Sequence, residues 1–370
     1  MATGTVTAAN LNFRSSPDGE IKKKLAKGAT VEILEDKGDW LKVRSDGQDG
    51  FVSSQFIQRA GDPPAAPPAS PPPAPPASVG GDFRFDGTAA IAPDGTRFAK
   101  KFKLGVFDYG TTSITRFVSD NSARFASVSP SKLRVLQAVS ENEGKLEAIN
   151  TWDNAFLTFG IFQWTVGSAD GAGELPSLLD RLKQTSPSVF DTFFGQHGLD
   201  AAVTSAQPGV TPVGFFKLNG VTLKASGQKG QLRTLEWAYR FWLAGHDDTV
   251  RQVQIDHAMG RVDIFYRSDR HKIGDRFIAD YVTSEFGVAL LLDQHVNRPG
   301  NVPATISKAV TQIGGGDPAG WSDAQEKRLL DTYIKLRAQT TMTDSNKRAD
   351  AIRKAVTAGL ASDKRGSYQP

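Results

Sequence analysis

Two carboxylates in one stretch of the chain could together cleave a glycosidic bond. The stretch runs from Val135 to Trp164 and has the sequence VLQAVSENEGKLEAINTWDNAFLTFGIFQW. It places Glu143 near the end of a helical pattern and Asp153 among the turn residues that follow. In glycosidases one protonated carboxyl donates its proton to the glycosidic oxygen, while a second carboxylate activates water or stabilises positive charge on the sugar.

The helix that leads to Glu143 is predicted from its start signal and its apolar periodicity. Ser129 can cap the helix, and Pro130 suits the first turn. At about 100° per residue, Leu136, Val139 and Glu143 fall on one side of the helix. The spacing therefore predicts that Glu143 faces the interior of its domain.

The predicted helix end affects the charge of Glu143. Gly144 can adopt the left-handed conformation that often ends a helix, which places Glu143 in the last turn. The negative end of the helix dipole and partial burial both disfavour a carboxylate there, so we expect a raised pKa. Glu141, two residues earlier, falls on the opposite side. A frayed helix end with a solvated Glu143 is the alternative.

Side chains after the helix could bind a sugar. The segment NTWDNAFLTFGIFQW predicts a short hairpin with Asp153 near its turn. Asn150 and Gln163 could hydrogen-bond acetamido groups, and Trp152 and Trp164 could stack on sugar faces. Core packing is the alternative for the tryptophans.

A second polar segment follows a strongly apolar helical pattern. LLLDQHVNRPGN, residues 290–301, carries polar side chains directly before Pro299. A core helix that delivers polar groups to a substrate groove would have this pattern, with Asn297 and Arg298 contacting sugar or a lactyl carboxylate. A core helix that simply ends would have it too.

The first stretch resembles the catalytic signature of phage-type lysozymes. The matching residues are Glu143-Gly144, Asp153, Thr158, Gly160-Ile161 and Gln163. The resemblance implies that Glu143 is the general acid, that Asp153 is the base or electrostatic partner, and that Thr158 helps to place water. Asp153 lies one residue later than the commonest spacing, and Gln163 replaces the usual histidine of that family.

A second register is similar to goose-type lysozymes and lytic transglycosylases. In those families a Phe-Gly-Leu-Met-Gln run follows the catalytic glutamate, and FGIFQ resembles it. This register selects Glu141 as the acid, whereas the helical-face argument favours Glu143. Both registers lie within about twenty residues of a much longer domain.

The first sixty residues predict a small β-barrel. Short alternating runs are separated by turn signals such as PDG and SDGQDG. The segment resembles the bacterial Src-homology-3-like (SH3-like) family in LNFRS at 11–15, in Trp40, and in Gly50-Phe51-Val52. That resemblance implies binding to bacterial cell wall or docking within a wall hydrolase; a purely structural barrel is the alternative.

Three segments are predicted overall. Residues 61–82 hold nine of the twenty prolines and almost no charge, which favours an extended spacer between domains; a proline-rich ligand for a partner domain is the alternative. Residues 83–130 have β-like or irregular patterns, and mostly helical patterns follow. The sequence thus predicts an α+β protein with an SH3-like domain at 1–60, a linker at 61–82 and a lysozyme-like domain at 83–370.

Composition excludes several kinds of site. The chain has no cysteine, and its five histidines form no short-range ligand pair, so we expect neither a metal nor another cofactor. The net charge of +4 is spread over 370 residues without a nucleic-acid-binding motif. We see no classical signal peptide and no apolar run long enough to span a membrane.

The predicted function is hydrolysis of peptidoglycan glycan strands between N-acetylmuramic acid and N-acetylglucosamine. The alternatives are a lytic transglycosylase, a hydrolase of chitosan-type polymers, and a non-catalytic wall-binding or injection-device protein. We expect a monomer that is made in the cytoplasm and reaches the wall through a holin or a secretion system. An injected effector would have a cognate immunity protein as partner.

Overall fold

The computed structural model describes the chain except for residues 1, 8–9, 18, 38–39, 60–81 and 141–142. Two compact units are formed, Met1–Pro75 and Pro76–Pro370. The predicted linker at 61–82 lies outside the described residues apart from Asp82, and Glu141 lies outside them too. The architecture is α+β, with a β-rich first unit and a larger second unit that holds the helices.

The first unit is an antiparallel sheet of short strands in the order β3-β2-β6-β5-β4-β1-β7. Its core includes Phe13 and Val52, both fully buried. A Cβ on Gly50 would lie 2.4 Å from the Phe13 ring, so glycine allows the two strands to approach there. The strands are β1 (Ala2–Val6), β2 (Asn10–Arg14), β3 (Ile21–Ala26), β4 (Thr30–Asp36), β5 (Trp40–Ser45), β6 (Gln48–Ser53) and β7 (Ile57–Arg59). The turn signals predict five or six strands, whereas the described residues of this unit form seven; closure into a barrel stays a prediction.

The second unit begins with another sheet, in the order β14-β13-β12-β11-β10-β9-β8. The turn signals of residues 83–110 correctly predicted the first strands, and Gly95 has the positive φ (+88°) that the turn before β10 requires. The strands are β8 (Arg84–Asp86), β9 (Ala89–Ile91), β10 (Arg97–Phe102), β11 (Gly105–Asp108), β12 (Ile149–Asn150), β13 (Thr158–Phe159) and β14 (Trp164–Thr165). This sheet joins the hairpin of Asp153 to the strands before α2.

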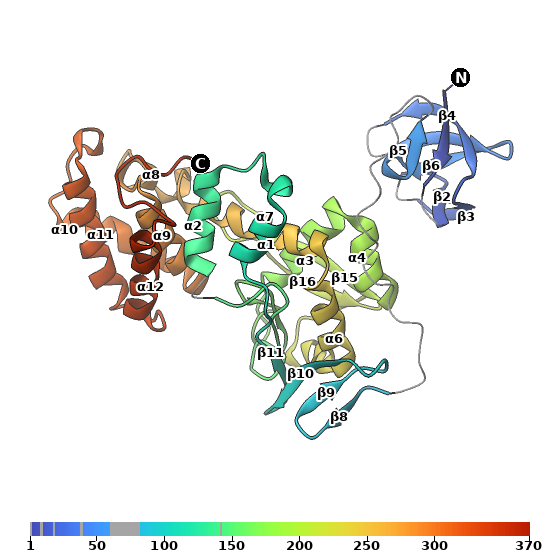
Figure 1. Cartoon of the computed structure of the whole chain (residues 1–370), viewed down its shortest axis with the longest axis horizontal. Coiled ribbons are helices and arrows are strands. Elements are labelled where there is room, and N and C mark those ends of the chain that lie inside the picture. Colours follow the sequence, from blue (N-terminus) through green and yellow to red (C-terminus); the bar gives the residue numbers. More distant parts are fainter. Residues whose placement is uncertain (1, 8–9, 18, 38–39, 60–81, 141–142) are drawn as a thin grey trace. The chain divides into compact units, whose positions relative to one another are not determined.

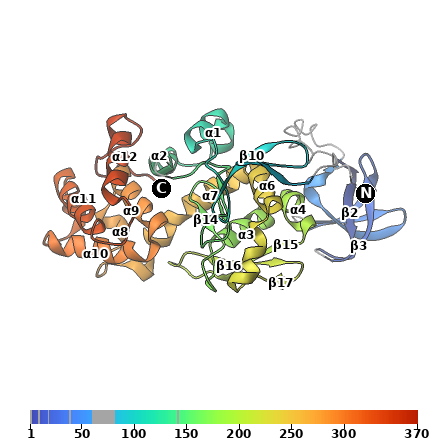
Figure 2. The same cartoon turned by 90° about the horizontal axis from the view of Figure 1, so that it is seen from below.

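Helices form most of the remainder. They are α1 (Ile114–Asp120), α2 (Pro130–Ser140), α3 (Leu175–Thr185), α4 (Pro187–Phe193), α5 (Ser226–Lys229), α6 (Leu235–Ala244), α7 (Asp248–Phe265), α8 (Ile278–Tyr281), α9 (Glu285–Asn297), α10 (Val302–Gln312), α11 (Asp323–Arg337) and α12 (Ser345–Thr357). Within this unit, α9 to α12 gather at one end and β8 to β11 lie at the other (Figures 1 and 2). Apolar residues at helical spacing, as in LPSLLDRLKQ (175–184) and QLRTLEWAYRFWLAG (231–245), predicted α3, α4, α6, α7 and α11. The patterns missed α1, α10 and α12. They also missed a small sheet of β15 (Leu199–Ser205), β16 (Val213–Leu218) and β17 (Val221–Thr222).

Helix α9 is the central element of the helical end. Its residues Glu285 to His295 are all buried, including both of its faces. The apolar pattern of residues 276–296 does not form one helix, because residues 282–284 separate α8 from α9. Ser284 caps α9 by accepting a hydrogen bond from the Gly287 N–H at 3.0 Å.

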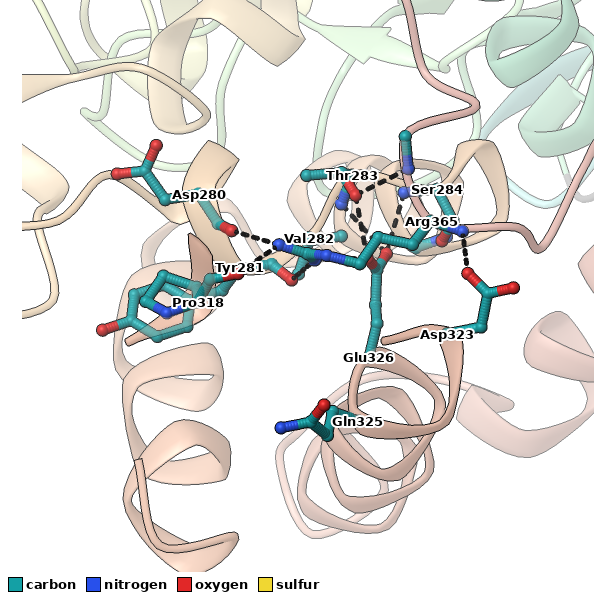
Figure 3. Close-up of polar contacts among 12 residues, drawn as sticks. Asp280, Tyr281, Val282, Thr283, Ser284, Pro318, Asp323, Gln325, Glu326 and Arg365 are labelled. Carbon is teal, nitrogen blue, oxygen red and sulfur yellow. Dashed lines mark hydrogen bonds and ion pairs between the residues drawn. The ribbon is translucent and has the colours of Figure 1, made fainter. Parts of the chain in front are cut away.

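A buried carboxylate fixes the start of α9. Glu326 of α11 accepts hydrogen bonds from the backbone N–H of Thr283 at 2.9 Å and of Ser284 at 2.8 Å (Figure 3). Its other oxygen accepts from the Thr283 hydroxyl at 2.9 Å and pairs with Arg365 at 2.7 Å. Because Glu326 is 2% exposed, these donors replace the water that the carboxylate loses.

The C-terminal segment, residues 362–370, fastens several helices together. The Arg365 guanidinium donates to the carbonyls of Tyr281, Asp280 and Pro318. Further along, the Gln369 N–H donates to the Ser131 hydroxyl at the start of α2 at 3.1 Å. The segment therefore joins α2, α8 and α9, although they are far apart in the sequence.

We predict that Glu326→Ala destabilises the second unit by about 3–5 kcal/mol, because it leaves Arg365 and two backbone donors buried without their carboxylate. The helical circular dichroism signal during urea unfolding measures this, since the helices belong to the second unit. Asp331→Ala is the control: Asp331 pairs with Arg353 on the surface, and its loss should cost less than about 1 kcal/mol. Equal midpoints for the two variants would contradict the proposed role of Glu326.

Candidate active site

Glu143 lies just beyond α2 and not in its last turn. Helix α2 ends at Ser140, whose carbonyl accepts from the Glu143 N–H at 3.1 Å. The expectation that Gly144 ends the helix in a left-handed conformation is wrong, because Gly144 does not have a positive φ. Glycine is required at position 144 for another reason: a Cβ there would lie 2.7 Å from the Gln163 side chain. The predicted inward orientation is correct, since the Glu143 side chain is 10% exposed.

Alternating charges surround Glu143. Its carboxylate pairs with Arg348 of α12, and Arg348 also contacts Asp293 of α9 at 2.6 Å. Asp293 in turn pairs with Arg337 of α11 at 3.0 Å, and both of these side chains are fully buried. Two carboxylates and two guanidiniums thus form one chain of contacts, which we call the Glu143 cluster. Buried charges of opposite sign at this distance offset part of each other's desolvation cost.

The pKa of Glu143 is raised to about 7. Burial is the largest cause, and the negative charge of Asp293 acts in the same direction. Arg348 and, more weakly, Arg261 lower it. A carboxyl with this pKa holds its proton in a large fraction of molecules near neutral pH, which a general acid requires.

A second ionic group joins α7 to Glu174, the residue before α3. Glu174 pairs with Arg261 and, at 3.1 Å, with His257. Arg261 also donates to the His295 carbonyl at 3.0 Å. Burial lowers the pKa of His295 to about 3, so its imidazole is neutral. Arg261 is therefore held in place by α9 while its charge acts on Glu143.

The turn that follows β13 holds the Glu143 segment against the hairpin. The Gly144 N–H donates to the Ile161 carbonyl at 3.0 Å. Gln254 of α7, fully buried, donates to the Leu146 carbonyl at 2.7 Å and accepts from the Ile161 N–H at 3.2 Å. Gly160 has a positive φ of +77°, and a Cβ on it would lie 2.2 Å from the Gln254 amide oxygen. These contacts explain why Gly160 and Gly144 occur in the motif.

Gln163 also has a positive φ, +52°, and its amide donates to the Gly160 carbonyl at 2.9 Å. A non-glycine residue in this conformation is strained, and it is kept here by its own hydrogen bond. The amide lies beside Gly144. The structure therefore brings Gln163, a predicted substrate-binding residue, next to the Glu143 segment.

Asp153 lies in the turn between β12 and β13. One carboxylate oxygen accepts from the Asn150 amide at 2.9 Å, and the other accepts from the Ala155 N–H at 2.9 Å. The Asp153 carbonyl accepts from Arg233. Both oxygens thus stabilise the turn, and no described contact joins Asp153 to the Glu143 cluster.

The hairpin presents two different faces. Strand pairing aligns Asn150 with Thr158, and Thr158 with Thr165. Side chains alternate along a strand, so these three share one face, and Trp164 lies on the other. Trp164 is 2% exposed and packs against Phe162 and His257. The structure places it in the core, so the expectation that it stacks on a sugar is not supported.

The predicted polar end of α9 contributes in a different way than expected. Arg298 donates to the Thr341 hydroxyl at 3.2 Å and to the Asn297 carbonyl at 2.9 Å, and no described contact joins either residue to Glu143. Asp293, one turn earlier, is the residue that reaches the cluster. The sequence carries no local signal for Arg348, which is 205 positions from Glu143.

Glu147 is a third glutamate of the same motif, and its role is structural. One of its oxygens accepts from the backbone N–H of Thr111 at 2.6 Å and of Thr112 at 2.9 Å. Burial opposes its charge, but these hydrogen bonds lower its pKa. The described residues contain no group of three His, Asp or Glu side chains arranged to hold a metal ion. No helix in the described part of the chain is long and apolar enough to cross a membrane.

Comparison with known proteins assigns one part of the chain. Residues 9–58 match the bacterial SH3 domain family, which confirms the SH3-like part of the prediction. Bacterial SH3 domains are common in proteins associated with the cell wall. No curated protein and no solved structure matches the chain significantly.

We predict that ionisation of Glu143 makes the stability of the fold depend on pH. An unfolded chain leaves this carboxyl at its ordinary pKa of 4.5, whereas folding raises the pKa to about 7, so the folded form binds the proton more tightly. The free energy of unfolding therefore falls by about 3 kcal/mol in total as the pH rises from about 4.5 through about 7. Glu143→Gln lacks this loss. In urea unfolding between pH 5 and 8, the free energy of unfolding of the variant should therefore increase relative to that of the native chain as the pH rises. If the free energies of unfolding of the two chains change with pH in parallel, Glu143 is not buried as described.

Proposed function

We propose that the second unit is a glycoside hydrolase that cleaves peptidoglycan between N-acetylmuramic acid and N-acetylglucosamine. The observation that carries the proposal is the Glu143 carboxyl: it is 10% exposed, its pKa is raised to about 7, and it lies against a short hairpin. Such a group can protonate a glycosidic oxygen at neutral pH. The SH3 match at residues 9–58 supports a wall polymer as the substrate.

In this mechanism Glu143 donates its proton to the leaving oxygen while Arg348 and Asp293 hold the carboxyl in place. After proton transfer the carboxylate is paired with Arg348, which stabilises the charge that the step creates. Asp153 and Thr158 would act on water or on positive charge at the sugar. Asn150 of β12, Trp152 in the turn that follows, and Gln163 beside Gly144 would contact the substrate. The tethered SH3-like unit would raise the local concentration of enzyme at an insoluble polymer.

A lytic transglycosylase is the second candidate, and one observation favours it. Both carboxylate oxygens of Asp153 are engaged in the turn, so Glu143 is the acidic side chain with the clearest chemical role. A transglycosylase needs one acid–base residue, because the substrate's own hydroxyl replaces water and an anhydro sugar forms. The non-catalytic alternative predicts no cleavage by any variant.

Mass spectrometry of purified peptidoglycan after digestion separates these functions. We expect hydrated reducing ends from the native chain and at least a roughly 100-fold loss of product with Glu143→Gln, because the proton donor is removed. Glu236→Gln is the control, since Glu236 forms a surface pair with Arg240. Anhydro ends would establish the transglycosylase, and intact glycan with the native chain would contradict both enzymatic functions.

Arg348→Met tests the role of the cluster. Arg348 lowers the pKa of Glu143, so its loss should raise that pKa further. The general acid would then stay protonated to higher pH. We therefore expect the alkaline limb of the kcat/KM profile to move to higher pH, with Arg348→Lys lying between native and Met variant. If the alkaline limb of the profile does not move, it reports the titration of another residue.

A further inference from the structure

The sheet of β8 to β14 has one covered face and one open face in the region of β10 and β11. On the covered face, Tyr239 and Trp242 of α6 pack on Phe98, with ring centroids 5.0 and 6.3 Å apart. The Trp242 N–H also donates to the Asp108 carboxylate at 3.2 Å. Strand alternation places Phe107, the neighbour of Asp108, on the opposite face.

The open face carries a cluster of aromatic side chains with one lysine, which we call the aromatic platform: Phe102, Lys103, Phe107, Tyr109 and Trp152. The Phe102 ring lies 5.8 Å from Phe107 and 5.0 Å from Trp152, and Phe107 lies 5.1 Å from Tyr109. Tyr109 is 76% exposed and Phe102 is 41% exposed. Large rings that remain this accessible while touching one another form a patch of the kind that binds partners.

The backbone brings the platform to the hairpin of Asp153. A Cβ on Gly105 would lie 2.4 Å from the Thr151 hydroxyl oxygen, so glycine lets β11 approach this residue closely. The Val106 N–H donates to the same oxygen at 3.0 Å. Trp152 follows directly, and its N–H donates to the Asn150 side chain at 3.0 Å. The platform and the turn of Asp153 are therefore one continuous surface.

The platform has a positive charge. Lys103 lies over the Trp152 ring, with its Nζ 4.5 Å from the centroid. Lys100 aligns with Phe107 across the strands and is exposed. Within the described residues neither lysine forms an ion pair, so both charges are available to a ligand. Exposed rings next to ammonium groups suit a sugar polymer that also carries carboxylates.

We propose that the aromatic platform binds a peptidoglycan glycan strand and extends the substrate site beyond the cleavage point. Phe102 and Tyr109 would stack on sugar rings, and Lys100 and Lys103 would pair with lactyl or stem-peptide carboxylates. The strand register places Phe107 of β11 beside Asn150 of β12, so the glycan would run from the platform toward the turn of Asp153. Thr158, the next residue of this row in β13, is buried. This inference rests on the proposed function for the identity of the polymer. The platform itself takes no part in bond cleavage.

Calorimetry on the full chain tests the inference in a Glu143→Gln background, so that the ligand is not cut. The ligand is soluble, uncross-linked glycan strands from purified peptidoglycan. We expect Phe102→Ala combined with Tyr109→Ala to weaken binding about tenfold. Lys103→Glu leaves every ring in place and should weaken binding in a salt-dependent way. Val221→Ala is the control, because it removes an exposed apolar side chain elsewhere in the unit.

The SH3-like unit is present in every variant, so differences between variants report on the second unit alone. Unchanged affinity in both platform variants would overturn the inference, and so would binding to phosphatidylglycerol vesicles that depends on the same residues. The platform and the proposed chemistry can fail separately. The glycan could bind, and the platform variants could weaken that binding, while the native chain still leaves the glycan intact. This result would contradict the hydrolytic function alone.

Discussion

The contact of Arg348 with both Glu143 and Asp293 is the interaction on which the helical end of the second unit depends. Burying two carboxylates costs several kcal/mol each unless cations accompany them. Arg348 and Arg337 provide these cations from α12 and α11, and Asp293 extends from the buried part of α9. The positions of three helices are thus coupled to the protonation of one carboxyl.

Two opposing effects act on the ionisation of the Glu143 carboxyl. Burial alone would keep the carboxyl neutral, and its direct pairing with Arg348 favours the charged form. Burial has the larger effect, so the pKa rises to about 7, and Arg348 keeps it from rising further. The hairpin helps to position Glu143. Gln254 hydrogen-bonds both Ile161 and Leu146, and these bonds fix the short segment that carries Glu143.

Local patterns in the sequence were sufficient for features that depend on neighbouring residues. Turn glycines and alternation predicted the SH3-like strands, and Gly50 proved necessary for the packing of Phe13. Periodicity predicted that Glu143 faces inward, although its predicted position in the last helical turn was wrong. Arg348 and Gln254 could not be found in this way, since their contacts with the Glu143 segment are long-range. The same limit applies to Trp152 and Trp164: both lie in one aromatic stretch, and only strand pairing shows that Trp164 belongs to the core.

The C-terminal segment has a consequence for biosynthesis. Domains generally begin to fold during synthesis, starting from the N-terminal side. Here Arg348 follows Glu143 by 205 positions, and residues 362–370, which connect α2 to α8 and α9, are synthesised later still. Glu143 therefore lacks its ionic partner until Arg348 has been synthesised, and a nascent or truncated chain that ends before Arg348 does not hold the assembled site.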